Sequence, residues 1–363
     1  MKTISYYVSD YGYGHASRSI AIIRTLLDKY DNVQFIICTS FPLGFIQTSI
    51  ENNSRVRYRY VKNDLGYLLK ESSVEIDKER MIFLYDKYLE YASSYLQQEE
   101  YYLKEENVDF IISDISPFPF IAGKKLGLPT IGISNFTWYK AYQGIIEEDK
   151  LQFLKDAYNQ MDYFIPLAGS KEPEWGKILH EAEHYFYRGI RNSEIKRLND
   201  EVRSNEFQLI VYFGFGMKID IDDYSGWKLW DQEHVLFIVS EHMNIDRPNV
   251  IHIPKDYTES QHYLAISDLV ISKAGWSTVG EVVQLNKPFM VVDRSNMQED
   301  RNTINFLQSI ERGYVILWDE LKELTFNEEL FHKVQRSTRE SEYPSNQEIL
   351  DGIGDSIGKV LKE

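Results

Sequence analysis

Short apolar runs alternate with longer amphipathic stretches along the first half of the chain. The runs have the length of β-strands, and the stretches between them repeat apolar residues with a helical period, as Ile20, Ile23 and Leu27 do. The pattern predicts strands at residues 4–9, 33–39, 55–61, 108–113, 130–134 and 163–167, and helices at 17–30, 76–107 and 117–126. The run at 33–39 is almost wholly apolar, which is typical of a parallel sheet covered on both faces.

The alternation weakens between residues 168 and 205, where Gly169, Pro173 and Gly176 interrupt it and charged residues become more frequent. We interpret this segment as the crossing between two domains. Beyond it the scheme restarts, with strands predicted at 207–213, 235–239, 250–253, 269–272, 289–292 and 314–317, and a final helix at 347–361. Each half opens with a strand and a glycine-containing turn, as doubly wound α/β domains do.

We therefore expect two Rossmann-like, doubly wound α/β domains. The first spans residues 1–190 and the second residues 206–345, with the crossing at about 168–205. The helical stretch 346–363 is expected to pack back on the first domain. Because such folds bind ligands outside the carboxyl ends of their parallel strands, the functional residues are expected in the turns that follow the strands.

Composition restricts the partners more than it restricts the fold. The chain of 363 residues is 43% hydrophobic and 26% charged, an ordinary globular balance. No apolar run approaches the ~20 residues that span a bilayer, and the start of the chain is interpreted as a strand, not a signal peptide. A net charge of -16 disfavours nucleic acid and anionic membranes as partners. A single cysteine, Cys38, fits a cytoplasmic protein.

The turn after the first predicted strand contains Gly12 and Gly14, followed by His15 and Arg18. Glycines there let the backbone approach a ligand, and the helix N-terminus offers N–H groups to an anionic or hydroxyl-rich ligand. Ser17 stands where a dinucleotide fingerprint has its third glycine, so the turn matches that fingerprint poorly. An imidazole can take a proton from a hydroxyl, so His15 is a candidate general base, or else a plain cap of the turn. Arg18 is placed on the acceptor side, where it holds a ligand or pairs with an acid; the alternative is a solvated helix residue.

A carboxylate is expected to orient such a histidine through its other ring nitrogen. Asp114 ends a predicted strand of the first half and is the main candidate, with Asp10 as another option. The alternative role for Asp114 is to cap the helix that starts near Pro117. Asn135 and Trp138 follow a further strand and are candidates for the acceptor side, although burial in the core is a rival role for the aromatic ring.

The richest motif lies in the second half, where a strand is followed by Lys273, Gly275, Ser277, Thr278 and Glu281. A glycine turn opens a helix near Ser277, and amides and hydroxyls at that N-terminus can hold a diphosphate. Lys273 adds a positive charge. Glu281, about one turn into the helix, can accept both ribose hydroxyls, or else it only stabilises the helix dipole.

Three further stretches of the second half carry candidate residues. Gly214 and Gly216 follow the first predicted strand of this half, where they let a loop approach phosphate or simply form a tight turn. Asp300, Arg301 and Asn302 begin a later helix and either contact sugar hydroxyls or cap that helix. The acidic residues at 220–223 are interpreted as a solvated loop, so no metal site is expected.

The stretch 268–302 resembles the donor-binding signature of GT-B glycosyltransferases. It is similar to the peptidoglycan GlcNAc transferases and to plant secondary-product glucosyltransferases, which have Gly-Trp in the same turn. The resemblance implies that Ser277 and Thr278 contact the diphosphate, that Glu281 contacts the ribose, and that residues 300–302 contact the hexose. Lys273 departs from the pattern, because the plant enzymes have a phosphate-contacting histidine at that position.

The stretches 12–18, 113–117, 134–138, 213–216 and 225–228 resemble the glycosyltransferase-like N-terminal region of plant L-arabinokinases. They lie in both halves, so the resemblance spans most of the chain. The galactokinase-like portion of those proteins has no counterpart here, and kinase activity is not implied. The resemblance implies a GT-B fold, in which two Rossmann-like domains face a central cleft, with His15 as the base.

We therefore expect a cytoplasmic, metal-independent, inverting hexosyltransferase that needs no cofactor and uses a nucleotide sugar, with UDP-sugar as the family default. One alternative is a nucleotide-sugar hydrolase or epimerase, which would turn over the donor without an acceptor. Another is a non-catalytic protein that only binds the nucleotide sugar. The hexose, the acceptor and the oligomeric state stay open.

Overall fold

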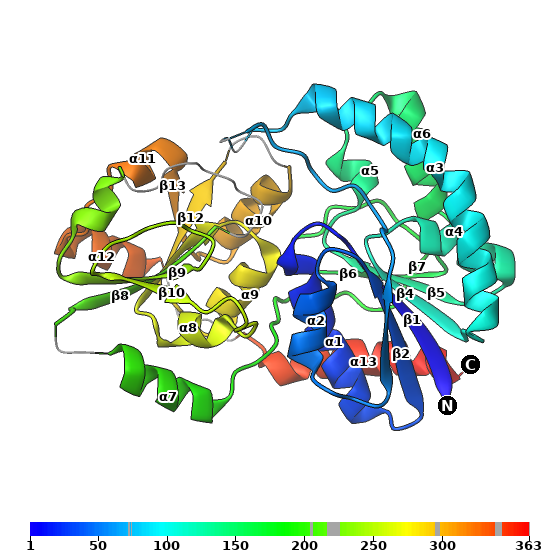
Figure 1. Cartoon of the computed structure of the whole chain (residues 1–363), viewed down its shortest axis with the longest axis horizontal. Coiled ribbons are helices and arrows are strands. Elements are labelled where there is room, and N and C mark those ends of the chain that lie inside the picture. The colour runs from blue at the N-terminus through cyan, green and yellow to red at the C-terminus, as the bar shows by residue number, and fades with distance from the viewer. Residues whose placement is uncertain are drawn as a thin grey trace. The chain divides into compact units, whose positions relative to one another are not determined.

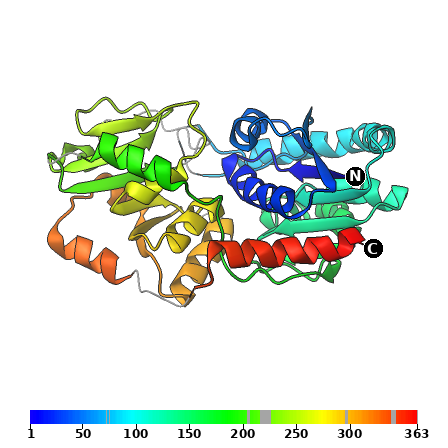
Figure 2. The same cartoon turned by 90° about the horizontal axis from the view of Figure 1, so that it is seen from below.

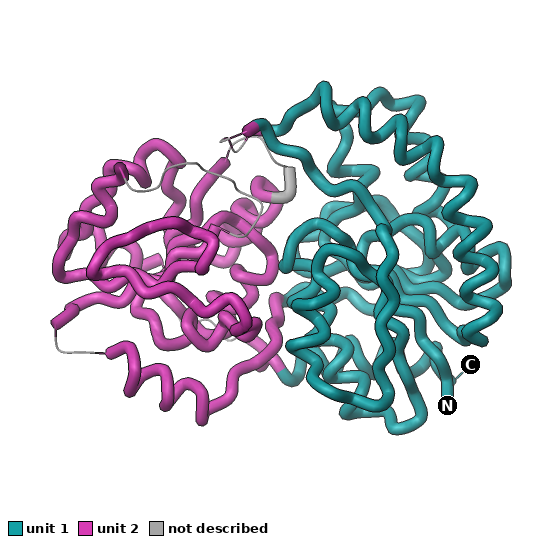
Figure 3. The backbone as a smooth tube through the Cα atoms, viewed as in Figure 1, with its two compact units in different colours: residues 1–70, 76–184, 347–363 teal, residues 71–75, 185–346 magenta. Residues whose placement is uncertain are grey.

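The computed structural model describes residues 1–71, 73, 75–203, 206–215, 226–294, 298–337 and 343–362. It divides into two compact units (Figures 1 and 3). Unit 1 comprises Met1–Lys70, Ile76–His184 and Gln347–Glu363, and unit 2 comprises Glu71–Glu75 and Tyr185–Asn346. Each unit has a parallel sheet with helices packed around it, so the predicted class of two α/β domains is confirmed.

The described strands of unit 1 form a parallel sheet in the order β3-β2-β1-β4-β5-β6-β7. Their bounds are β1 Lys2–Val8, β2 Val33–Thr39, β3 Val56–Tyr60, β4 Phe110–Asp114, β5 Thr130–Ser134, β6 Tyr163–Pro166 and β7 Lys177–Ile178. The helices of the unit are α1 Tyr13–Lys29, α2 Leu43–Ile50, α3 Lys78–Glu105, α4 Phe118–Leu126, α5 Trp138–Ala141, α6 Glu148–Tyr158 and α13 Asn346–Lys362. The strand order reverses between β1 and β4, which creates a switch point.

The helices bury the apolar positions that predicted them. In α1, Ile20 and Ile23 are fully buried and Leu27 is 4% exposed. α4 ends at Gly127, whose φ of +69° is the left-handed conformation that stops a helix. In the part of the chain that the structure describes, no helix combines the length and the apolar character that crossing a membrane requires.

The last helix, α13, belongs to unit 1 and lies beside α1 (Figure 2). Ile353 and Ile357 of α13 are fully buried. The Tyr30 hydroxyl donates to the carbonyl of Gly354 at 3.2 Å, and Lys29 Nζ lies 2.7 Å from a carboxylate oxygen of Asp355. Unit 1 is therefore built from the two ends of the chain.

The described strands of unit 2 form a parallel sheet in the order β10-β9-β8-β11-β12-β13, with a switch point between β8 and β11. Their bounds are β8 Leu209–Gly214, β9 Val235–Ser240, β10 Val250–Ile253, β11 Leu269–Lys273, β12 Phe289–Asp293 and β13 Tyr314–Leu317. The helices are α7 Asn192–Val202, η1 Lys228–Asp231, α8 Gln261–Ile266, α9 Trp276–Gln284, α10 Gln298–Ser309, α11 Trp318–Lys322 and α12 Glu328–Arg336. Segment 168–205 contains β7 and α7, and the chain passes between the units at His184–Tyr185.

Gly280 in α9 gives a direct test of packing in unit 2. A Cβ atom at this position would lie 2.4 Å from the backbone oxygen of Phe186, closer than real contacts allow. Although alanine is the better helix former, we expect Gly280→Ala to lower the free energy of unfolding of unit 2 by about 1–3 kcal/mol, measured by urea unfolding.

Gly354→Ala in α13 is the matched control for that substitution. Its Cβ would lie 3.4 Å from Thr25 Cγ2 and 3.6 Å from Lys29 Cδ, which are ordinary contacts. Alanine is the better helix former, so Gly354→Ala should raise the free energy of unfolding by about 0.5–1 kcal/mol. Equal stabilities of Gly280→Ala and the wild type would contradict the close packing of α9.

Candidate active site

His15 lies in the first turn of α1, at the carboxyl edge of the unit 1 sheet. β1 ends at Val8, and α1 begins at Tyr13 after a loop in which Gly12 has a φ of +76°. This conformation is strained for other residues, so Gly12 lets the chain turn sharply into the helix. Gly14, in the same turn, is exposed. The loop stands at the switch point beside β1 and β4, where sheets of this class bind ligands.

His15 and Arg18 both contact the carboxylate of Asp114, the last residue of β4. His15 Nδ1 lies 2.9 Å from Asp114 Oδ1, while Arg18 Nε donates to Oδ2 at 2.7 Å and Arg18 Nη2 donates to Oδ1 at 2.6 Å. Arg18 also donates to Asn135 Oδ1 at 2.6 Å and to Ser134 Oγ at 3.1 Å. Since Arg18 is 2% exposed, it belongs to a buried network and is not a solvated helix residue.

Asp114 is ionised at neutral pH. Burial alone would raise the pKa of its carboxyl group, but the charge of Arg18 and the contact with His15 outweigh burial and hold the pKa at about 2. With its proton on Nδ1, His15 donates to Asp114, and Nε2 has a lone pair that can accept a proton. With its proton on Nε2, His15 would instead accept at Nδ1 from Arg18 Nη2, 2.9 Å away, and Nε2 would have no lone pair to accept a proton. The carboxylate favours the first tautomer.

Asp10, the other candidate partner of His15, organises loops. Its Oδ1 accepts from the backbone N–H of Ser40 at 2.6 Å and from the hydroxyls of Ser40 and Thr39 at 2.7 and 3.1 Å. Its Oδ2 accepts from the backbone N–H of Asn63 at 2.6 Å. Asp10 therefore joins the loop after β1 to the loops after β2 and β3.

A second buried carboxylate near His15, Asp64, was missed by the sequence analysis. It follows β3 at the same edge of the sheet and is 2% exposed. Asp64 Oδ1 accepts from the backbone N–H of Asp10 at 3.0 Å, and Oδ2 accepts from Ser116 Oγ at 3.2 Å and from Trp138 Nε1 at 3.0 Å. Burial, reinforced by the charge of Asp10, raises the pKa of Asp64 to about 6. Its position just after a strand was the available signal.

Trp138, predicted on the acceptor side, is 1% exposed and packed among other rings. Its ring lies edge-on to Phe136 at 5.3 Å, to Tyr11 at 5.6 Å and to Tyr67 at 5.7 Å. The centroid of His15 is 6.4 Å from that of Trp138 and 5.7 Å from that of Phe136. Trp138 thus forms part of the buried wall beside the imidazole, which is the packing role considered as its alternative.

The glycine motif of unit 2 lies at the second switch point. Gly214 ends β8 and is paired with Ser272 of β11, so Gly214 and Lys273 lie on adjacent strands at the carboxyl edge. A Cβ atom on Gly214 would lie 2.6 Å from the ring of Tyr212, which accounts for a glycine here. Gly216 and the acidic stretch 220–223 lie outside the described residues.

The N-terminus of α9 presents the residues predicted to hold a diphosphate. The helix begins at Trp276, with Gly275 as its N-cap, one residue before the predicted start. Ser277 is 9% exposed and Thr278 is half-buried. The backbone N–H groups of a first helical turn have no acceptor within the helix, and with the helix dipole they attract an anion. Lys273, at the end of β11, adds a positive charge to this edge.

Glu281 is a buried carboxyl group of unit 2. It lies in α9, is 5% exposed, and burial raises its pKa to about 7. The charge of Arg188 opposes this rise and that of Glu259 adds to it. A buried carboxylate whose pKa is raised by desolvation is under-solvated, so it gains from hydroxyl groups that donate to it.

The predicted sugar-contacting residues of α10 have different surroundings. The Asp300 carboxylate is 1% exposed and forms a bidentate pair with Arg294, in which Nε and Nη2 each donate at 2.6 Å. Arg301 is exposed and Asn302 is half-buried. Arg294 was not predicted, because its partner lies six residues further on, across the end of β12 and outside any recognisable motif.

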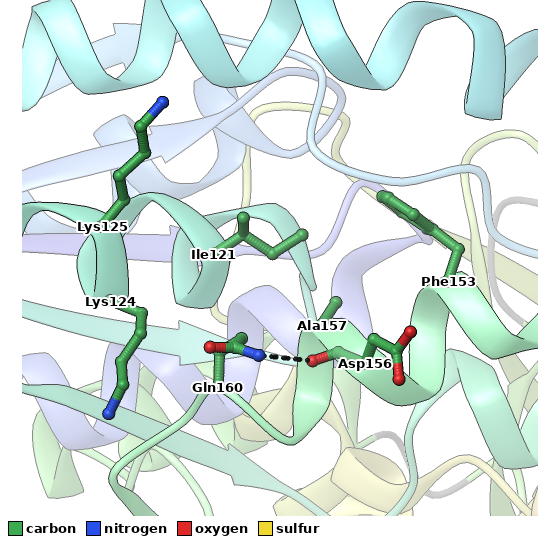
Figure 4. Close-up of a pocket in the computed structure, with 7 residues that line it drawn as sticks. All are labelled: Ile121, Lys124, Lys125, Phe153, Asp156, Ala157 and Gln160. Carbon is green, nitrogen blue, oxygen red and sulfur yellow. Dashed lines mark hydrogen bonds between the residues drawn. The ribbon is translucent and has the colours of Figure 1, made fainter.

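A pocket of about 410 Å³ lies elsewhere on unit 1, between α4 and α6 (Figure 4). It is lined by Ile121, Lys124, Lys125, Phe153, Asp156, Ala157 and Gln160. Lys125 Nζ lies 2.8 Å from Glu100 and Lys124 Nζ lies 3.6 Å from Asp162, so both charges are already compensated. None of the predicted site residues lines this pocket, and we assign no function to it.

Parts of the chain resemble proteins that are already known. Residues 232–352 match the glycosyltransferase family 28 C-terminal domain. L-arabinokinase of Arabidopsis thaliana is 26% identical over 325 residues, which cover 84% of this chain. The match spans only 30% of the length of that relative.

Solved structures of similar fold cover nearly the whole chain. UDP-glucose:anthocyanidin 3-O-glucosyltransferase in complex with UDP is 11% identical, with a TM-score of 0.60 and coverage of 99% of both chains. The calicheamicin glycosyltransferase CalG4 is 12% identical, with a TM-score of 0.59 and coverage of 100% of this chain and 99% of that chain. The chain therefore has the fold of these glycosyltransferases, and its residues 232–352 resemble the glycosyltransferase family 28 C-terminal domain.

Proposed function

We propose that the protein transfers a hexose from a nucleotide sugar to an acceptor hydroxyl, with inversion at the anomeric carbon and without a metal ion. The observation that carries the proposal is the contact between His15 and the ionised Asp114 at the switch point of unit 1. That contact favours a basic Nε2, which a general base needs. A relative in fold that was solved with bound UDP supports a UDP-sugar as the donor.

In this reaction His15 Nε2 takes the proton of the acceptor hydroxyl. The acceptor oxygen then forms a bond to the anomeric carbon, and the bond from that carbon to the diphosphate oxygen breaks. Transfer to the face opposite the leaving group inverts the configuration. Asp114 stabilises the imidazolium that forms, because it is a carboxylate in contact with Nδ1.

We propose that unit 2 holds the nucleotide diphosphate. The first-turn amides of α9 and the hydroxyls of Ser277 and Thr278 would donate to the phosphate oxygens, and Lys273 would add its charge. These groups supply the charge compensation that a metal ion gives in other enzymes. Glu281 would accept from the ribose hydroxyls, and α10 would supply the hexose contacts through Arg301 and Asn302.

Glu281→Gln tests the ribose contact, with opposite effects on binding and on stability. A nucleotide at ~100 times its dissociation constant should stabilise the wild type by ~2.7 kcal/mol, visible as a thermal shift, and this shift should be lost in the variant. Because folding raises the pKa of Glu281 from 4.5 to about 7, its ionisation opposes folding at higher pH. The variant without ligand should therefore be more stable than the wild type above pH 7, by at most about 3 kcal/mol.

Glu329→Gln, an exposed residue of α12, is the control and should keep the nucleotide shift. The panel contains several nucleotide sugars and the corresponding free nucleotides, so that a shift also identifies the base. A shift that persists in Glu281→Gln would remove Glu281 from the nucleotide site. The absence of any shift in the wild type would reject the nucleotide-sugar site itself.

A further inference from the structure

The loop at residues 61–70 lies across the carboxyl ends of the central strands of unit 1. Asn63 Nδ2 donates to the carbonyl oxygens of Val8 at 3.0 Å and Cys38 at 2.7 Å, at the ends of β1 and β2. From the other side, α3 donates to Asn63 through the hydroxyls of Tyr88 and Tyr95, at 3.3 and 3.2 Å. The loop is therefore fixed between the sheet and α3.

Further along, the same loop is tied to α5. The Tyr142 hydroxyl donates to the carbonyl oxygen of Gly66 at 3.0 Å, and the Tyr67 hydroxyl donates to that of Ala141 at 3.0 Å. Gly66 has a φ of +71°, and a Cβ atom there would lie 2.5 Å from the ring of Tyr11. The loop thus comes into close contact with the turn that leads to His15.

Asp64 connects this loop to the segments that carry the His15 network. Its donors include Asp10, in the loop before His15; Ser116, just after Asp114; and Trp138, just after Asn135. Each of these segments begins at the carboxyl end of a different strand, namely β1, β4 and β5. One carboxylate therefore accepts from all three segments that carry the His15 network.

The ionised carboxylate of Asp64 suits these partners, because each of them donates a hydrogen bond to it. Oδ1 receives the backbone N–H of Asp10, and Oδ2 receives the indole N–H of Trp138 together with the Ser116 hydroxyl. A backbone N–H and an indole N–H can only donate, so neither can reverse its role. An asparagine at this position would place its N–H₂ group opposite one of these donors, and two donors cannot form a hydrogen bond with each other.

We propose that Asp64 is a positioning residue for the transfer reaction proposed above. It holds the turn before His15, the segment after Asp114 and the ring of Trp138 in one arrangement, and so fixes where the imidazole meets the acceptor hydroxyl. It acts through these groups and contacts neither substrate. The inference rests on the proposed function for its kinetic consequences, and on the contacts of Asp64 alone for its structural ones.

Asp64→Asn is the first test, with Asp109→Asn as the matched control. Asp109 Oδ2 accepts from the backbone N–H of Thr3 at 2.7 Å, at the opposite end of β1. Each variant replaces a carboxylate that accepts a hydrogen bond from a backbone N–H near one end of β1. We expect Asp64→Asn to lower kcat by about tenfold to a hundredfold with little change in the KM of the nucleotide sugar, and Asp109→Asn to leave kcat near the wild-type value.

A double-mutant cycle with Trp138→Phe separates positioning from general damage. Phenylalanine removes the indole donor that opposes the new amide N–H₂ group. The kcat loss caused by Asp64→Asn should therefore be at least about threefold smaller in the Trp138→Phe background than in the wild type. If the kcat loss of the double variant equals the product of the losses of the two single variants, the proposal is overturned.

The imidazole ¹⁵N resonances of His15 give a readout that needs no activity, and His15→Gln assigns them. Asp64→Asn should shift these resonances, and Asp109→Asn should leave them in place. If the wild type transfers no sugar from any donor, the proposed function fails, while the His15 resonances still decide the role of Asp64. Unchanged His15 resonances in Asp64→Asn would reject the positioning role whatever the kinetics show.

Discussion

Replacing His15 with glutamine should lower kcat for sugar transfer by about 10²- to 10⁴-fold and leave nucleotide binding unchanged. Glutamine can still donate to Asp114, so the buried network keeps a partner at this position, but its amide accepts no proton at neutral pH. The residues proposed to hold the nucleotide belong to unit 2, whereas His15 belongs to unit 1. The measurement is single-turnover transfer to the acceptor, with a thermal shift for nucleotide binding.

His234→Gln is the control, because His234 is an exposed residue of unit 2 outside both candidate sites. It should transfer sugar at the wild-type rate. Donor hydrolysis is recorded with and without acceptor in all three proteins. Wild-type activity in His15→Gln would remove His15 as the base, and rapid turnover that no acceptor accelerates would favour a hydrolase over a transferase.

Arg18→Met should destabilise unit 1 by about 3–5 kcal/mol at pH 7. Arg18 is 2% exposed and Asp114 is 1% exposed, so loss of the guanidinium leaves a buried carboxylate without its cation. The low pKa of Asp114 means that its contribution to stability is complete above its ordinary pKa of 3.8 and is lost as the pH falls towards 2. Urea unfolding at pH 7 therefore measures the full effect.

Two further variants show whether the effect comes from the unpaired charge. Arg18→Met combined with Asp114→Asn should recover part of the lost stability, since no buried charge is then left unpaired. Arg197→Met removes a surface arginine that contacts Glu194 and Glu201, and it should unfold at a urea concentration close to that of the wild type. A double variant less stable than Arg18→Met would contradict the explanation by charge.

The sequence predicted the strands and the glycine turns because both leave local patterns. The apolar run at 33–39 became β2 with the predicted bounds, and the turn before Tyr13 placed His15 at the carboxyl edge of the sheet. Because β1 and β4 are adjacent, the turn after β1 and Asp114 at the end of β4 lie at the same edge of the sheet. Patterns of period two or 3.6 carry this information, since they record which face of an element is buried.

The same patterns do not record which polar group meets which. Asp64 reaches Trp138 across 74 residues and Asp10 across 54, so no local spacing marks these contacts. A buried arginine such as Arg18 looks like a surface arginine until its partners are known. Trp138 was placed at the acceptor because it follows a strand, but tertiary packing turned its ring into the interior.

The position of α13 has a consequence for the synthesis of the protein. Unit 1 takes its last helix from residues 347–363, so the whole of unit 2 emerges from the ribosome before unit 1 has all its parts. Until then the growing chain lacks the helix that packs against Thr25 and Lys29 of α1. Apart from Glu71–Glu75, unit 2 is continuous from residue 185 to 346 and can collapse as soon as it is made. The order of folding is therefore expected to differ from the order of the sequence, with the second unit reaching its native core first.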